Sequence, residues 1–331
     1  MIINIDALNG LKKLNSDSID TCITSPPYYG LRDYGVDGQV GLEENPQEYV
    51  GKMVEIFREV RRTLRPDGTL WFNIGDSYAG SGKGRMGNGS HSKDRSKSSD
   101  YLNIAGGKLK VTKPVGCKRK DLIGIPWLLA FALREDGWYL RQDIIWHKPN
   151  CMPESANDRC TKSHEYIFLL SKSPKYYFDY EAIMEPCVSN NNQLPAGSKG
   201  TLGQANSRIR AKGNNNTFRC GGVYTNNRSY NNSADKDKSS VGNIPNTTGL
   251  RRKRSVWSIA TKGYKGAHFA TFPPELVKPC ILAGSRAGGI VLDPFAGSGT
   301  TAEVAKCLGR EFVAIEINPD YCKLIQERIG E

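Results

Sequence analysis

The sequence predicts an α/β fold with a doubly wound, mostly parallel sheet. Short apolar segments typical of strands alternate along the chain with segments whose apolar residues recur at helical spacing. Such alternation predicts parallel strands that are covered by helices on both faces. With 331 residues, the chain can bury one large core and carry a small appendage.

The N-terminal part supplies the first elements of this sheet. In chain order we expect a strand at 1–5, a helix at 7–11, a strand at 19–23, a helix at 49–64 and a strand at 69–74. The longest of these has Val50, Met53 and Phe57 on one helical face. A Pro-Asp-Gly turn at 66–68 is expected before the last strand.

Regular structure resumes after a stretch rich in glycine and serine. Pro126 predicts the first turn of a helix that Gly137 closes, because proline fits that position and glycine ends helices. We then expect strands at 138–146, 165–170 and 176–178. The remaining elements are a helix opening at 273–275, a strand at 289–293, a helix at 302–308, a strand at 311–317 and a helix at 319–329.

Positive charge is concentrated in two segments with few apolar residues. The formal charge of the chain is +12. Residues 79–120 contain eleven Lys or Arg against two Asp, and residues 186–255 contain twelve against two, which leaves the remainder near −7 (12 − 19). Two basic inserts in an acidic core predict a polyanionic partner, although solvated loops would have the same composition.

Several classes of protein are disfavoured by composition. No apolar run is long enough for a membrane-spanning helix, and the N-terminus lacks a secretion signal. The nine cysteines include no Cys-x-x-Cys pair, and the four histidines are not paired at metal-ligating spacing. We therefore expect a cytoplasmic protein with reduced cysteines and no metal site.

A glycine-rich turn near the C-terminus predicts a site for a nucleoside cofactor. The strand at 289–293 runs into Gly297-x-Gly299 and then into a helix, so a ligand can approach the backbone closely. Glu316 ends the following strand, where its carboxylate can accept hydrogen bonds from both hydroxyls of a ribose. Because Gly297-x-Gly299-x-x-Ala302 also fits a dinucleotide site, an NAD-dependent oxidoreductase is an alternative.

Residues around this turn favour S-adenosylmethionine over NAD. Asp293 at the strand end can meet the cationic methionine end of that cofactor, whereas it would repel a pyrophosphate. Phe295 offers an apolar wall. If the strand at 1–5 lies beside this unit, Asp6 reaches the cleft edge, where it can accept a hydrogen bond from the adenine amine or cap the following helix.

A second chemical motif, Thr24-Ser-Pro-Pro-Tyr28, follows the strand at 19–23. The exocyclic amine of a nucleobase is a poor nucleophile, and acceptors aimed at its two N–H bonds localise its lone pair. The Ser25 hydroxyl and the Pro26 carbonyl can be these acceptors, because consecutive prolines restrict the carbonyl direction. Tyr28 can stack on a base flipped out of a duplex. Alone, the motif also fits an ordinary Pro-Pro turn.

The two motifs together resemble those of the DNA amino-methyltransferases, which methylate the cytosine N4 or adenine N6 amine. "TSPPY" is similar to the catalytic motif of that family, and "DPFAGSGTT" is similar to its cofactor motif. The catalytic motif comes first, which is the permuted order of the beta group. The resemblance implies an S-adenosylmethionine-dependent methyltransferase fold whose core is formed by 1–185, with the basic flexible insert 79–120, and by 256–331. Residues 186–255 would be the target-recognition insert.

The same resemblance assigns residues to the site. The segment "HFATFPPEL" resembles a further cofactor motif of the family. Catalysis is assigned to Ser25, Pro26, Pro27 and Tyr28. Cofactor contacts are expected from Asp6, Phe269, Phe272, Asp293, Phe295, Gly297, Gly299, Thr300 and Glu316.

The first residue of the catalytic motif bears on the choice of base. In the family, Ser at this position usually accompanies cytosine N4, and Asp or Asn accompanies adenine N6. Ser25 therefore predicts methylation of cytosine N4, with adenine N6 as the alternative. Cytosine C5 methylation would need a cysteine nucleophile, and neither Pro-Cys pair, at 186–187 or 279–280, ends a strand beside the cofactor motif.

The resemblance implies that double-stranded DNA is the partner of a prokaryotic or phage-encoded enzyme. Lys and Arg side chains of the inserts would contact phosphates. The run Arg251, Arg252, Lys253 and Arg254 is either a phosphate clamp or a solvated face. A cognate restriction endonuclease is a further expected partner. An inactive DNA-binding protein and a methyltransferase of RNA or protein are competing interpretations of the same motifs.

Overall fold

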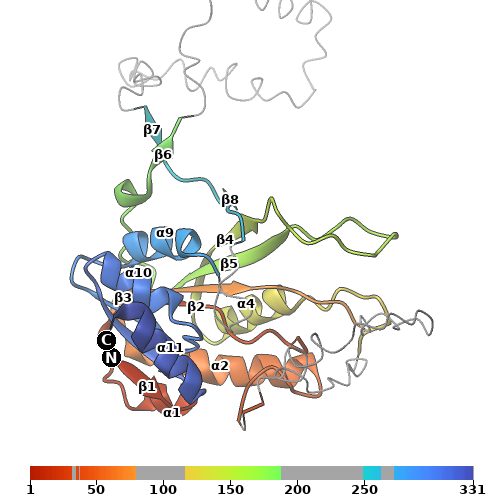
Figure 1. Cartoon of the computed structure of the whole chain (residues 1–331), viewed down its shortest axis with the longest axis horizontal. Helices are drawn as coiled ribbons and strands as arrows, with labels where there is room; N and C mark the ends of the chain where they lie inside the picture. Colours follow the sequence, from red (N-terminus) through yellow and green to blue (C-terminus); the bar gives the residue numbers. More distant parts are fainter. Residues whose placement is uncertain (32–34, 37, 80–115, 188–248, 262–271, 331) are drawn as a thin grey trace, which may run out of the picture. The chain divides into compact units, whose positions relative to one another are not determined.

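A single mixed sheet of eight strands organises the chain in a computed structural model (Figure 1). The structure describes residues 1–31, 35–36, 38–79, 116–187, 249–261 and 272–330. The strand order is β1-β10-β9-β2-β3-β5-β4-β8, and within the sheet only β5 runs against its neighbours. The strands are β1 (Ile2–Asn4), β2 (Ile19–Thr24), β3 (Leu64–Ile74), β4 (Tyr139–His147), β5 (His164–Ser171), β8 (Val256–Ser258), β9 (Ile290–Asp293) and β10 (Glu311–Glu316).

Helices cover both faces of the sheet, which confirms the predicted doubly wound α/β fold. One face packs against α1 (Ala7–Lys12), α2 (Pro46–Thr63) and α4 (Ile125–Glu135). The other face packs against α9 (Pro274–Gly284), α10 (Thr300–Cys307) and α11 (Pro319–Ile329).

Along the inner strands, successive apolar side chains pack alternately against the helices on one face of the sheet and on the other. On β3, Leu70 and Phe72 pack on the α2 side, whereas Trp71 packs on the α9 side. All three are at most 2% exposed. A strand segment with both faces buried is mostly apolar, which explains the continuous apolar run at 70–72 in the sequence.

The two ends of the chain meet in the sheet. β1 pairs with β10 in parallel, with Asn4 opposite Glu316, and the N-terminal ammonium group donates to the Phe312 carbonyl (2.9 Å). β2 pairs with β9 in parallel, with Cys22 opposite Leu292. The loops that follow β2 and β9, which carry the two sequence motifs, therefore leave the same edge of the sheet from adjacent strands.

Two local predictions differ from the structure. The turn expected at 66–68 lies within β3, where the register between β2 and β3 shifts. The strand expected at 176–178 is absent: the Tyr177 amide donates to the Asp67 carbonyl (2.9 Å), and the Phe178 ring stacks on Trp71 with centroids 6.1 Å apart. The segment 176–178 therefore packs against the face of the sheet and does not add a strand to its edge.

Residues Met184–Lys253 form a second compact unit, and Met1–Ile183 with Arg254–Glu331 form the first. The described part of the second unit contains an antiparallel pair of short strands, β6 (Glu185–Pro186) and β7 (Leu250–Arg251). Arg251 Nε donates to Glu185 Oε1 (3.0 Å), and Lys253 Nζ lies 3.9 Å from the other oxygen of Glu185. Most of the two basic inserts, 80–115 and 188–248, lies outside the described residues.

Two further observations concern only the residues that the structure describes. No helix among them is both long enough and apolar enough to cross a membrane. No three of their His, Cys, Asp or Glu side chains are grouped so that they could hold a metal ion.

Candidate active site

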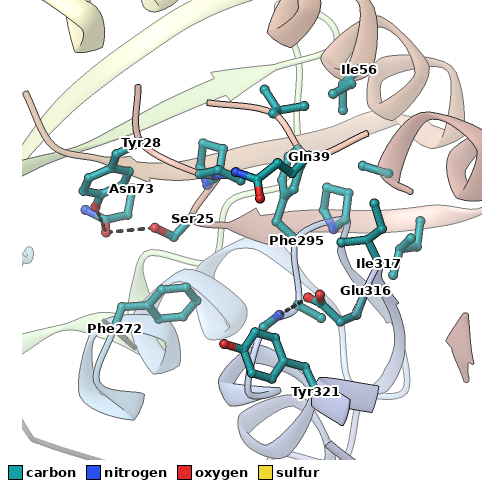
Figure 2. Close-up of a pocket in the computed structure, with 18 of the residues that line it drawn as sticks. Ser25, Tyr28, Gln39, Ile56, Asn73, Phe272, Phe295, Glu316, Ile317 and Tyr321 are labelled. Carbon is teal, nitrogen blue, oxygen red and sulfur yellow. Dashed lines mark hydrogen bonds between the residues drawn. The ribbon is translucent and has the colours of Figure 1, made fainter. Parts of the chain in front are cut away.

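A cavity of about 810 Å³ lies at the edge of the sheet where the two sequence motifs meet. Its walls come from segments that are far apart in the chain: the loops after β1 and β2, the turn after β9 and the end of β10. Figure 2 shows Ser25 and Tyr28 on one side and Phe295, Glu316 and Tyr321 on another. One cavity therefore brings the predicted catalytic and cofactor motifs together.

A buried carboxylate joins the two motif loops. Thr24 Oγ1 donates to Asp293 Oδ1 (2.6 Å), and Thr301 Oγ1 donates to Asp293 Oδ2 (2.7 Å). The Phe295 amide also donates to Oδ1 (3.1 Å). Burial raises the pKa of Asp293 to about 6, although these hydrogen bonds oppose the shift.

The structure gives Asp293 a structural role, and its expected contact with the cofactor stays a prediction. The carboxylate is 3% exposed and is not part of the cavity wall. Its hydrogen bonds instead fasten the end of β2 to the glycine-rich turn. Asp293 is thus a structural link between the two motifs, because a buried carboxylate needs such partners.

The two glycines of the turn have different roles. Gly297 lines the cavity with a φ of +52°, and its amide donates to Glu316 Oε2 (2.7 Å). Gly299, with a φ of +80°, does not line the cavity, and a Cβ on it would lie 2.9 Å from Ile325. Close packing against α11 is a structural reason for glycine at this position, and the expected cofactor contact of Gly299 stays a prediction.

Glu316 is held in a defined orientation at the cavity wall. Its Oε1 accepts from the Asn318 amide (2.9 Å), and its Oε2 accepts from the Gly297 amide. Burial, reinforced by Asp293, raises the pKa of Glu316 to about 7 against the effect of these hydrogen bonds. Because each carboxylate oxygen has a second lone pair, both can still accept a hydrogen bond from a ligand hydroxyl.

The remaining predicted cofactor residues fall into two groups. Asp6, Phe272, Phe295 and Thr300 line the cavity. Asp6 is also the N-cap of α1, since its Oδ1 accepts from the Asn9 amide (3.0 Å), and its contact with the cofactor stays a prediction. Phe269 lies outside the described residues.

The catalytic loop is anchored from behind by tyrosine hydroxyls. The fully buried Tyr49 donates to the Pro27 carbonyl (2.8 Å). The Tyr28 hydroxyl donates to Glu165 Oε2 (2.7 Å) and lies 3.0 Å from Asn73 Oδ1. No described residue donates to the Pro26 carbonyl. All four predicted catalytic residues line the cavity, and the Ser25 hydroxyl lies 3.5 Å from Asn73 Oδ1, to which it can donate while its lone pairs stay available as acceptors.

Sequence reasoning missed several wall residues. They are Asn73 on β3, Trp146 on β4, Lys148 after β4, Glu165 on β5, and Ile317 and Tyr321 near the C-terminus. No local motif marks the four residues on or after β3, β4 and β5, because their place in the wall depends on how these strands pair. Arg251, Arg252 and Lys253 belong to the second unit and Arg254 to the first, and their contact with DNA stays a prediction.

The family is established by sequence similarity. The sequence model of the DNA methylase family N6_N4_Mtase matches residues 19–327. The type II methyltransferase M.SmaI of Serratia marcescens is 44% identical over 328 residues, which cover 99% of this chain and 90% of that protein. The type II methyltransferase M.Cfr9I of Citrobacter freundii is 42% identical, covering 98% of this chain and 85% of that protein.

Solved structures show the same fold. The cytosine-N4-specific PvuII DNA methyltransferase superposes with a TM-score of 0.59 at 16% identity, covering 99% of this chain and 85% of that one. A putative DNA modification methylase of Thermus thermophilus, solved with S-adenosyl-L-methionine, superposes with a TM-score of 0.55 at 21% identity, covering 99% and 92%. With its family match over residues 19–327 and its two motifs in one cavity, the chain belongs to the DNA methylase family of S-adenosylmethionine-dependent DNA methyltransferases.

Proposed function

We propose that this enzyme transfers a methyl group to the N4 amine of cytosine in double-stranded DNA. The observation that carries the proposal is the presence of Ser25, at the first position of the catalytic motif, in one cavity with Phe295 and Glu316. In the family, serine at this position usually accompanies cytosine N4, and adenine N6 is the second candidate. Membership of the family speaks against the NAD-dependent alternative.

The cofactor half of the cavity fits a nucleoside. We propose that the Glu316 carboxylate accepts hydrogen bonds from the two ribose hydroxyls, while Gly297 lets the ligand approach the turn. Phe295 and Ile317 offer apolar surface for the adenine ring. Asp6 lies at the cavity edge and can accept from the adenine amine. S-adenosylmethionine, when bound, supplies the electrophilic methyl group.

The other half of the cavity fits an amine of a flipped base. The Ser25 hydroxyl and the Pro26 carbonyl can each accept from one N–H bond of the amine, which favours a tetrahedral nitrogen with a localised lone pair. Figure 2 shows Phe272 across the cavity from Tyr28, with Ser25 between them. A base placed there presents its amine to Ser25 and its ring faces to aromatic side chains.

DNA would be held by the basic segments. We propose that 186–255 is the target-recognition insert and that Arg251, Arg252, Lys253 and Arg254 contact phosphates. The relatives named above are type II methyltransferases, and we propose a cognate restriction endonuclease as a partner in the cytoplasm of a prokaryotic cell.

Nucleoside mass spectrometry tests the proposed base. Mixed-sequence DNA is incubated with the enzyme and methyl-labelled S-adenosylmethionine, digested to nucleosides and analysed. We expect the label in N4-methylcytosine. Label confined to N6-methyladenine would overturn the assignment from Ser25, and labelled 5-methylcytosine would contradict the amine chemistry altogether.

Cofactor affinity should depend on pH through Glu316. The carboxylate must be ionised to accept from both ribose hydroxyls, and its pKa in the free protein is about 7. Affinity is therefore full above pH 7 and is lost as the pH falls through that value. We expect the dissociation constant at pH 6 to be about tenfold higher than at pH 8 in equilibrium dialysis. The variant Glu316→Gln lacks this titration, so a slope as steep in the variant would contradict the assignment.

A further inference from the structure

Three polar side chains that no motif predicts form a network behind Tyr28. Glu165 is the second residue of β5, opposite Trp146 on β4. Lys148 follows β4, and its amide donates to the Ser163 carbonyl (2.7 Å), which continues the pairing of the two strands. Since residues two apart on a strand share a face, this pairing places Lys148 and Glu165 together, and both line the cavity.

The network fixes the Tyr28 hydroxyl from two sides. Glu165 Oε2 accepts from it at 2.7 Å, and Asn73 Oδ1 lies at 3.0 Å. Asn73 Nδ2 donates to the Tyr166 carbonyl (3.1 Å), so its amide oxygen is the atom that faces Tyr28. Lys148 forms an ion pair with the other oxygen of Glu165. The ammonium of Lys148 also lies over the Trp146 ring, 4.3 Å from its centroid.

The ring of Tyr28 is placed as tightly as its hydroxyl. A Cβ on Gly75 would lie 2.7 Å from Tyr28 Cε2, so the ring occupies space that only glycine leaves open. Burial and the neighbouring Glu165 raise the pKa of Tyr28 well above its usual value, which keeps the phenol a hydrogen-bond donor at neutral pH. A neutral donor to an ionised acceptor makes a stronger hydrogen bond than a neutral pair.

The ion pair between Lys148 and Glu165 orients the Glu165 carboxylate. The Lys148 and Glu165 side chains are only 19% and 16% exposed, so each charge needs the other as a partner. With one oxygen engaged by Lys148, the Glu165 carboxylate has its second oxygen directed at Tyr28. Without Glu165, the Tyr28 hydroxyl keeps only Asn73 Oδ1 as an acceptor, so the ring is held less firmly and has to be ordered during the reaction step.

We propose that Glu165, oriented by Lys148, is a positioning residue for methyl transfer: it fixes the Tyr28 ring as the wall against which the target base is held beside Ser25. The proposal rests on the proposed placement of the base at Ser25 and Tyr28. It assigns to Glu165 a role that is exerted entirely through Tyr28, so the two residues must be coupled energetically.

A double-mutant cycle on the full-length enzyme tests the coupling. Single-turnover rate constants with saturating S-adenosylmethionine and DNA are measured for wild type, Tyr28→Phe, Glu165→Ala and the double variant. We expect each single variant to be about tenfold slower, and the double variant also about tenfold slower, because both changes remove the same hydrogen bond. Glu165→Gln should be slowed less than Glu165→Ala, since its single amide oxygen can still accept one of the two hydrogen bonds.

Three controls separate positioning from folding. The cofactor dissociation constant should stay within about twofold of wild type in all variants, and the Tm of Glu165→Gln should match that of Asp136→Asn. Asp136 is a carboxylate of similar exposure, 13%, which pairs with Arg58 away from the cavity. Asp136→Asn is expected to keep the wild-type rate.

The outcomes distinguish this inference from the proposed function. A double variant about 100-fold slower, or Glu165→Ala at the wild-type rate, overturns the role of Glu165. Ser25→Ala is assayed in parallel. If Ser25→Ala is as fast as wild type, the placement of the base is wrong and the inference fails with it. If Ser25→Ala is slow while Tyr28 and Glu165 act independently, only the inference fails.

Discussion

Replacing Ser25 by alanine should slow methyl transfer about 100-fold, as expected when one of the few groups aimed at the reacting amine is removed. The Ser25 hydroxyl lies at the cavity wall and can accept from an N–H bond of the amine. Alanine leaves that bond without an acceptor, so the lone pair of the amine stays delocalised in the ring. The rate is measured in single turnover with labelled S-adenosylmethionine.

The same variant should bind the cofactor normally. Ser25 belongs to the catalytic loop, while the ribose is assigned to Glu316, so the cofactor dissociation constant should change less than about twofold. Ser18→Ala is a matched control, because Ser18 immediately precedes β2 and its hydroxyl donates to the Asn15 carbonyl (2.8 Å). If Ser25→Ala lost cofactor affinity but kept the wild-type rate at saturating cofactor, the assignment of Ser25 to methyl transfer and not to cofactor binding would be wrong.

Replacing Glu316 by alanine should weaken cofactor binding by between about tenfold and 100-fold. The change removes two hydrogen bonds from the ribose hydroxyls to a carboxylate, and a net contribution of about 1.5 kcal/mol from each corresponds to a loss on the order of 100-fold. It also leaves the Gly297 and Asn318 amides without their carboxylate acceptor, which loosens the turn. Isothermal titration calorimetry with S-adenosylhomocysteine measures the affinity without turnover.

Glu311→Ala is the matched control for Glu316→Ala. Glu311 is the exposed first residue of the same strand, β10, at the end away from the cavity. Glu311→Ala should bind the cofactor as wild type does. An unchanged affinity in Glu316→Ala would show that the ribose is held elsewhere in the cavity.

The fold and the main motif residues could be predicted because they depend on local pattern. Apolar runs and helical periodicity are properties of short segments, and they give nearly all the strands and helices within a few residues. The proximity of the chain ends was also predictable, since the glycine-rich unit needs a neighbouring strand and β1 supplies it beside β10. Asp6, Ser25, Phe295 and Glu316 accordingly line one cavity.

What could not be predicted depends on partners distant in sequence. The buried Asp293 carboxylate accepts a hydrogen bond from Thr24, which is 269 residues away in the chain. The close approach of Ile325 to Gly299 depends on how α11 packs against the glycine-rich turn. The network of Lys148 and Glu165 depends on the register of β4 with β5, and no short segment encodes that register.

The central claim is that one cavity, built by both ends of the chain, holds the cofactor with its sulfur facing the target amine. A crystal structure of the enzyme with S-adenosylhomocysteine tests this most directly. We expect the ribose hydroxyls within hydrogen-bonding distance of the Glu316 carboxylate and the sulfur directed toward Ser25 and Pro26. A ligand bound outside this cavity, or inside it with the sulfur directed away from Ser25, would contradict the account.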